Sequence, residues 1–312
     1  MKYATRINSF LRTGRNVLEA LHDIGKIDGL DYVDMNYPEH FKNNTLEEIK
    51  QTLAESGLKV NAINLRFRDK FLFGAFDNTD TGIRADAIQL CREAAAVCGK
   101  LGGRQCIIWL GFDGFDYSFQ KNYVRSWKML VDAFRTVCLE APCRISVEYK
   151  PYEERAFAMI DSWGAAWKLI EDVNCENFGC TLDMCHMLMK KENPAMAASL
   201  LLNQGKLTGI HINDGEGSFD DGLMVGTVHP FKTLELFYYL VKYNYQDVIY
   251  FDTFPKREDA VRECELNIRF SHQMEDAVRK IGVDEISRIV DAEDGIAAAE
   301  LMSRVLAEAL QS

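Results

Sequence analysis

Short apolar runs alternate with stretches of helical periodicity along almost the whole sequence, and this alternation constrains the fold more than any other feature. The apolar runs are Tyr3–Phe10, Leu30–Asn36, Lys59–Phe67, Gln105–Leu110, Arg144–Lys150, Phe178–Asp183, Leu207–Asn213 and Val248–Phe254. Helical periodicity between them marks Thr45–Ser56, Gly82–Cys98, Tyr123–Cys138, Ser162–Asp172, Asn193–Asn203 and Pro230–Tyr243. Near-continuous apolar runs are typical of parallel strands covered on both faces. The pattern therefore predicts an α/β fold, a closed (β/α)8 or TIM barrel.

The chain of 312 residues is long enough for one such barrel and a helical addition. Beyond the eighth predicted strand, residues 258–270 and 284–309 have amphipathic, helical patterns. We therefore divide the chain into a barrel domain at residues 1–270 and a C-terminal helical extension at residues 271–312. The extension is expected either to pack back over the barrel or to form an oligomerisation arm that wraps a neighbouring subunit in a homodimer or homotetramer.

Composition excludes several classes of function. The 36 Lys and Arg residues against 47 Asp and Glu give a net charge of −11, which repels nucleic acid and anionic lipid. The chain contains no uninterrupted apolar run long enough to span a bilayer. Its nine cysteines form no Cys-x-x-Cys pair and are typical of reduced thiols. We expect a soluble, cytoplasmic protein that acts on neither nucleic acid nor membrane.

Four successive predicted strands, the fifth to the eighth, carry a carboxylate or an imidazole near their ends. These groups are Glu148, Asp183, His211 and Asp252. Each alone could cap a helix or satisfy a backbone carbonyl. In a (β/α)8 barrel, however, strand ends converge on the catalytic face, and three carboxylates so close together need a compensating cation. Oxygen donors with one imidazole favour Mn²⁺, Mg²⁺ or Co²⁺, and Zn²⁺ is also compatible with them.

Lys150 follows Glu148 by two residues on the fifth predicted strand. Because side chains alternate between the two faces of a strand, Lys150 is expected on the same face as Glu148. Its ammonium group can then polarise a carbonyl oxygen on which negative charge develops. The alternative is an ion pair between Lys150 and Glu153 or Glu154.

The strand ends carry four ordered motifs: Glu-Tyr-Lys-Pro-Tyr-Glu from Glu148, Asp-Met-Cys-His from Asp183, His-Ile-Asn-Asp from His211, and Asp252. Over roughly residues 100–255 the chain resembles the xylose isomerase-like barrels, and most closely the L-rhamnose isomerase type of aldose–ketose isomerase. The resemblance implies that the four residues that begin these motifs hold a first divalent cation.

The resemblance also implies a second cation near the first. Its ligands would be His186, with Asp220 and Asp221 in the loop after the seventh predicted strand. The family commonly has a further Asp where this chain has Gly222. The second site is therefore expected to be weaker or ligated differently.

The same resemblance predicts which residues bind the substrate. The run of residues 108–114 is similar to the end of strand four in the family, where Trp109 would form a hydrophobic wall under a sugar. Asp113 of this run and His186 of the Asp-Met-Cys-His motif would also bind the sugar. The family's ring-opening His after strand three is missing from residues 61–68, so another group opens the ring or the substrate needs no opening.

Cationic side chains stand where that His is missing. Arg66 and Arg68, with Lys256 and Arg257 beyond the eighth strand, could bind a carboxylate, phosphate or sulfonate of the substrate. Alternatively they pair with the excess acidic residues of the chain.

The resemblance implies a metal-dependent aldose–ketose isomerase that transfers hydrogen in an open-chain sugar by a 1,2-hydride shift, with Lys150 as the electrophile. A site with one metal would instead favour a sugar epimerase in which Glu148 and Asp252 transfer protons. The short side chain of Asp252 and the presence of His186 favour the isomerase. A related lyase that cleaves sugar C-glycosides, or a barrel that binds a sugar without turnover, are further alternatives. A phosphodiesterase of the endonuclease IV type is disfavoured by the acidic chain and its six His residues.

Overall fold

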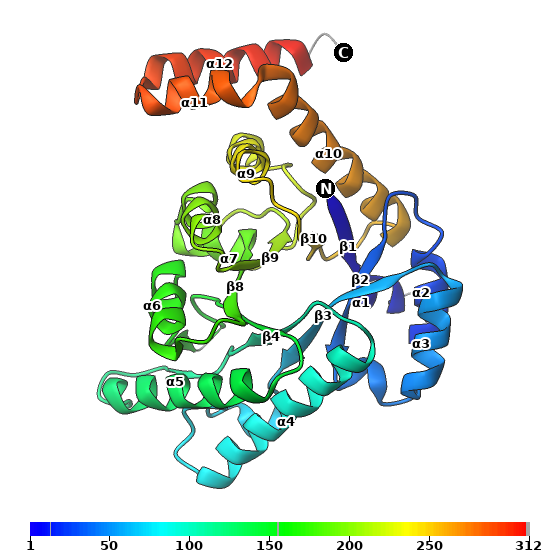
Figure 1. The fold of residues 1–312 in the computed structure, drawn as a ribbon, viewed down its shortest axis with the longest axis vertical. Helices are drawn as coiled ribbons and strands as arrows, with labels where there is room; N and C mark the ends of the chain where they lie inside the picture. Colours follow the sequence, from blue (N-terminus) through cyan, green and yellow to red (C-terminus); the bar gives the residue numbers. More distant parts are fainter. Residues whose placement is uncertain (13, 155, 310–312) are drawn as a thin grey trace.

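The computed structural model describes residues 1–12, 14–154 and 156–309 (Figure 1). Eight parallel strands close into a barrel, in the order β1-β10-β9-β8-β6-β4-β3-β2 around the ring. These strands are β1 (Lys2–Arg6), β2 (Tyr32–Tyr37), β3 (Lys59–Arg66), β4 (Gln105–Trp109), β6 (Arg144–Glu148), β8 (Phe178–Asp183), β9 (Leu207–Ile212) and β10 (Val248–Phe251). The predicted (β/α)8 barrel is confirmed.

Helices surround the strands on the outside (Figure 1). They are α2 (Val17–Ile24), α3 (Leu46–Glu55), α4 (Thr81–Lys100), α5 (Tyr123–Glu140), α6 (Trp163–Val173), α8 (Pro194–Asn203) and α9 (Pro230–Lys242). Two short helices, α1 (Ile7–Leu11) and α7 (Met184–Lys190), follow directly on the ends of β1 and β8. The predicted strand at Tyr3–Phe10 is therefore too long, because Ile7 and Phe10 are buried on a helical turn. No helix among the described residues has the length and apolar character to cross a membrane.

Capping residues explain where several helices begin. Asn16 and Thr45 form complete capping boxes with Glu19 and Glu48 at the starts of α2 and α3. Asp183 is at once the last residue of β8 and the N-cap of α7, because its carboxylate accepts the backbone N–H of His186 at 3.0 Å. This double role fixes the direction of the Asp183 side chain at the carboxyl end of the barrel.

Three helices follow the last strand. Helix α10 (Ala260–Ile281) packs against α9 and α1, whereas α11 (Val283–Asp291) and α12 (Gly295–Ala309) lie beyond α9 at one end of the molecule (Figure 1). Helix α10 runs without a break across residues 270 and 271, so the barrel domain and the extension share it. Assembly into a homodimer or homotetramer remains a prediction.

A small antiparallel pair lies outside the barrel. It joins β5 (Gly114–Phe115) to β7 (Phe157–Ala158), and so connects the loop after β4 with the loop after β6. An added Cβ at Gly114 would overlap the backbone carbonyl of Phe157, so this pairing requires glycine there. The pair connects the two loops that follow Trp109 and Lys150.

Candidate active site

The carboxyl ends of β6, β8, β9 and β10 bring four side chains into one buried cluster. Glu148, Asp183, His211 and Asp252 each offer a ligand atom, and these atoms all lie within 4.8 Å of one another. The His211 Nδ1 atom lies 3.4 Å from Oε1 of Glu148 and 3.9 Å from Oδ2 of Asp252. These are the four residues at the starts of the strand-end motifs.

Unpartnered polar atoms mark this cluster as a place for a cation. Within the described part of the chain, both ring nitrogens of His211 and Oδ1 of Asp252 are buried without a hydrogen-bond partner, although buried polar atoms are normally paired. Burial, helped by the neighbouring carboxylates, raises the pKa of Asp183 to about 7. Three carboxylates and an imidazole with free lone pairs fit a divalent cation.

Charge within the cluster shifts two further pKa values. Burial lowers the pKa of His211, but the charges of Glu148, Asp252 and Asp34 outweigh burial and raise it to about 10. Burial raises the pKa of Glu148, but the imidazoles of His211 and His186 and the guanidinium of Arg66 outweigh burial and lower it to about 2. Without a cation, a proton on His211 therefore offsets part of the negative charge.

Asn213 orients two of the four residues. Its Nδ2 atom donates to Oδ2 of Asp183 and to the backbone carbonyl of Asp252, both at 3.1 Å. Its Oδ1 atom accepts the backbone N–H of Cys185 at 2.8 Å. A fixed amide of this kind holds metal-ligating carboxylates in place. Asn213 stands in the His-Ile-Asn-Asp motif, but its residue type alone does not reveal this role.

Asp34 lies at the site although its sequence position did not predict it. It lies in the middle of β2, with Oδ2 3.9 Å from Nε2 of His211, and it accepts hydrogen bonds from Asn61 and Asn64 at 2.8 and 3.4 Å. Burial raises its pKa to about 7. An acidic residue inside the apolar run Tyr-Val-Asp-Met-Asn-Tyr was the signal that could have found it.

A second cluster adjoins the first and shares Asp183 with it. Asp183, Cys185 and Asp220 offer ligand atoms within 4.8 Å of one another. The Nε2 atom of His186 lies 3.3 Å from Oδ2 of Asp220, and its Nδ1 atom lies 3.7 Å from Oε1 of Glu148. His186 and Asp220 therefore meet beside the first cluster, and Cys185, which the sequence analysis did not select, lies next to them.

Asp221 is not a member of this second cluster, although its carboxylate and the Cys185 thiol both lie beside Gly215. Its Oδ2 atom accepts the backbone N–H of Glu216 at 2.8 Å, so the side chain closes the loop after β9. The neighbouring Gly222 has φ +59°, and an added Cβ would overlap the ring of Phe254. Packing thus explains why this chain has no Asp at position 222, since no side chain fits between the loop and Phe254.

Lys150 reaches the second cluster from the segment just after β6, because this strand ends at Glu148 and not at Lys150 as predicted. Its Nζ atom lies 3.1 Å from Oδ2 of Asp220, 2.8 Å from Oε1 of Glu153 and 5.8 Å from the centre of a Trp109 ring. Burial lowers the pKa of Lys150, but Asp220 and Glu153 outweigh burial and raise it, so the ammonium group keeps its proton. Lys150 thus lines the cavity and also forms the predicted ion pair with Glu153, while its action on a carbonyl oxygen stays a prediction.

A cavity of about 330 Å³ opens above the two clusters. Its lining residues include the aromatic side chains Trp109, Phe112 and Phe254 and the cations Arg6, Arg66, Arg68 and Lys150. Its remaining lining residues are Glu148, Glu153, His186, Asp220 and Asp252. Aromatic walls with a few converging polar groups are typical of a small-molecule site.

Three residues with predicted substrate contacts lie elsewhere. Lys256 and Arg257 are exposed and do not line the cavity. Asp113 is 1% exposed, and its carboxylate accepts the backbone N–H groups of Ala75 and Asp77 at 3.0 and 2.8 Å. The structure therefore places Asp113 behind the cavity wall, where it holds the loop that precedes α4.

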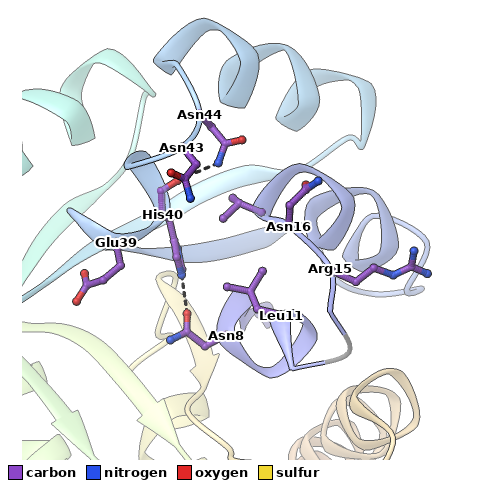
Figure 2. Close-up of a pocket in the computed structure, with 9 residues that line it drawn as sticks. Asn8, Leu11, Arg15, Asn16, Glu39, His40, Asn43 and Asn44 are labelled. Atoms are coloured by element: carbon purple, nitrogen blue, oxygen red, sulfur yellow. Dashed lines mark hydrogen bonds between the residues drawn. The ribbon is translucent and has the colours of Figure 1, made fainter.

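A second hollow, of about 490 Å³, lies between the loops after β1 and β2 (Figure 2). The Nε2 atom of His40 bonds Asn8 at the edge of this hollow (Figure 2). Its Nδ1 atom accepts the backbone N–H of Asn36 at 3.0 Å, so both ring nitrogens are used. Burial, with the charges of Arg66 and Arg6, lowers the pKa of His40 to about 4. Neither metal-ligand cluster found among the described residues borders this hollow, so the strand-end cavity is the candidate active site.

Comparisons with known proteins show the family and the fold of the chain. Residues 18–270 match the family described as "Xylose isomerase-like TIM barrel". A xylose isomerase from Thermus thermophilus is 27% identical over 238 residues, which cover 73% of this chain and 62% of that relative. The chain thus spans less than two thirds of the length of this curated relative.

Solved structures share the fold. The E. coli 3-keto-D-glucoside 4-epimerase is 21% identical with a TM-score of 0.66, over 88% of this chain and 99% of that one. The IolI protein, solved with a bound zinc atom, is 18% identical with a TM-score of 0.65, over 89% of this chain and 98% of that one. At these identities the similarity shows a common barrel.

Proposed function

Because the chain belongs to the xylose isomerase-like TIM barrel family, we propose that it is a divalent-metal-dependent sugar isomerase that interconverts an aldose and a ketose. One observation carries the proposal. Two clusters of ligand atoms share Asp183, and the protonated Lys150 stands beside them in a cavity with aromatic walls. Glu148, Asp183, His211 and Asp252 would hold one cation, and His186 and Asp220 would help to hold another. The similarity to a xylose isomerase supports this choice of substrate class.

A bound divalent cation would act as a Lewis acid toward the oxygens on adjacent carbons of an open-chain sugar. The chain's own groups do the rest. The Lys150 ammonium donates to the carbonyl oxygen as negative charge develops there, which is where a preorganised cation lowers a barrier most. Trp109 and Phe254 cover the apolar C–H faces of the sugar and exclude water.

Metal-dependent turnover is the direct test of this proposal. The protein is stripped with a chelator, reloaded separately with Mn²⁺, Mg²⁺, Co²⁺ or Zn²⁺, and assayed on a panel of aldoses and ketoses. We expect no turnover in the stripped protein and recovery with at least one of the cations. Full activity of the stripped protein, at a metal content far below one per chain, would refute a metal-dependent isomerase.

Sugar epimerisation is the second candidate, and the position of Asp220 favours it. Lys150 and His186 both contact Asp220, which leaves the second cluster with fewer free ligand atoms than the first. With one cation, Glu148 and Asp252, from β6 and β10, are the carboxylates that could move protons on the sugar. The epimerase neighbour is compatible with such chemistry.

Deuterium at C2 of the aldose separates the two candidates. A hydride shift passes the label from C2 to C1 without exchange, so the ketose should retain most of it in ordinary water. A carboxylate base would exchange the label with solvent. Under the isomerase proposal, His186→Ala should lower the rate of label transfer. Formation of an epimer of the starting sugar in place of a ketose, with complete wash-out of deuterium and a nearly silent His186→Ala variant, would replace the isomerase by the epimerase.

A further inference from the structure

The mouth of the active-site cavity has an acidic half and a cationic half. The lining carboxylates and His186 come from the ends of β6 and β10 and from the segments after β6, β8 and β9, where Lys150 also lies. Arg6 ends β1, Arg66 ends β3 and Arg68 follows it. In the barrel register, Arg66 pairs with Trp109, and Trp109 pairs with Glu148. Arg66 is thus two strands from Glu148 at the same level, which places their backbones about 10 Å apart. One short molecule can reach both halves.

Two of these three arginines have partners. The Nε atom of Arg68 lies 3.3 Å from Oε1 of Glu39. The Nε atom of Arg6 lies 3.8 Å from Oδ1 of Asp252, and its guanidinium group stacks on Phe254 with 4.3 Å to the ring centre. Each of these two guanidinium groups therefore has a carboxylate oxygen within 4.0 Å.

Arg66 differs from both of them. Across the described ranges, which omit residues 13, 155 and 310–312, its guanidinium makes no hydrogen bond and has no carboxylate within 4.0 Å. The nearby His40 offers it no acceptor, because both ring nitrogens of His40 are used by Asn36 and Asn8. Glu148, Asp252 and Glu39 attract this guanidinium only from beyond contact distance. A half-buried cation that lines a cavity with no hydrogen bond and no contacting carboxylate can take a ligand that supplies this contact.

We propose that the substrate carries a carboxylate at the end remote from its reacting carbons and that Arg66 binds this group, which makes the substrate a sugar acid such as a hexuronate. This inference rests on the proposed function, since the reacting carbons are placed at Glu148 and Asp183. A guanidinium offers a carboxylate two parallel N–H donors. One unpaired cation matches a single negative charge, whereas a phosphate monoester carries about −1.5 to −2 and would need a second free cation.

A matched series of hexoses tests the charge at C6. Glucose, glucuronate and glucose 6-phosphate differ only there, and the galacto and manno series cover the configuration of the other carbons. For at least one configuration, we expect the hexuronate to bind, and to react in the metal-loaded protein, at least about tenfold better than the hexose and the phosphate. Binding is also measured by calorimetry on chelator-treated protein, so that no cation can hold the carboxylate. The proposal is wrong if, in every configuration, the hexose or its 6-phosphate binds and reacts as well as the uronate, or if no uronate binds.

Three variants locate the recognition at Arg66. Arg66→Gln should lower the ratio of uronate to hexose affinity by about ten- to a hundredfold, and Arg66→Lys should lower it less, because lysine keeps the charge but loses the paired donors. Lys256→Gln removes the same charge from an exposed residue outside the cavity and should leave the ratio unchanged. An equal loss in Arg66→Gln and Lys256→Gln would show an effect of net charge alone and overturn the proposal.

The outcomes separate this inference from the proposed function. Uronate binding that depends on Arg66, without hydrogen transfer under any cation, would refute the isomerase and support the carboxylate site. Turnover of neutral sugars at the same efficiency as their uronates would support the isomerase and refute the carboxylate site.

Discussion

Asp183→Asn should make the metal-free protein more stable while it removes the metal site. Asp183 is fully buried among Glu148, Asp220 and Asp252, and burial is the main reason that its pKa rises from 3.8 to about 7. The folded state therefore disfavours the ionised carboxylate. Asparagine has nearly the same shape, can still accept the N–H of His186 as the N-cap of α7, and carries no charge.

The size of the effect follows from that pKa. A rise from 3.8 to about 7 corresponds to about 4 kcal/mol against the ionised form in the folded state. The new amide loses one of the hydrogen bonds from Asn213, which costs about 1 kcal/mol. We expect a gain of about 2–3 kcal/mol in the free energy of unfolding above pH 7.

The pH dependence gives this prediction its control. The unfolded carboxyl ionises near pH 3.8 and the folded one near pH 7, so the wild-type protein loses stability as the pH rises through this window. The gain of the variant should therefore vanish near pH 4 and be complete above pH 7. Urea unfolding in a chelator measures it, and added Mn²⁺ should stabilise only the wild-type protein. A variant that is less stable at pH 8, or that Mn²⁺ stabilises as much as the wild type, would refute the reasoning.

Three further predictions concern Lys150, the loop after β9 and the protons of the site. Lys150→Met should lower kcat by about 100-fold or more with little change in KM, because its charge acts on the transition state; a raised KM alone would make Lys150 a positioning residue. Gly222→Ala should destabilise the protein by about 1–3 kcal/mol in urea unfolding, because alanine at φ +59° is strained and its Cβ meets Phe254; unchanged stability would contradict this packing. Mn²⁺ binding at pH 7 should release about one to two protons, since His211 and Asp183 must be deprotonated to bind it; calorimetry in buffers of different ionisation enthalpy counts them, and no release would contradict these pKa values.

The barrel and the main cluster were predictable because their signals are local. Each barrel strand is a short apolar run between helical segments, and its period needs no knowledge of the rest of the chain. Glu148 and Asp183 end such runs, and the closed barrel then brings their side chains together. Local sequence and one topological rule are sufficient for these residues.

Other site residues depend on contacts that the sequence does not encode locally. Asp34 lies within a strand, and only the register of the barrel turns its side chain toward His211. Asp113 follows Trp109 closely in sequence, yet its carboxylate holds the backbone of a loop some 36 residues earlier. Asp220 and Asp221 are adjacent acids in one loop, but Asp220 contacts His186 whereas Asp221 accepts the backbone N–H of Glu216. The loop turns at Gly222, which has a left-handed conformation and packs against Phe254.

The proposed function depends on a divalent cation at the ends of β6, β8, β9 and β10. Anomalous diffraction from crystals soaked with Mn²⁺ tests it most directly. We predict one strong peak among Glu148, Asp183, His211 and Asp252, and a weaker second peak beside His186 and Asp220. Under saturating Mn²⁺, no peak among the first four residues, or a strong peak only elsewhere on the molecule, would contradict this proposal.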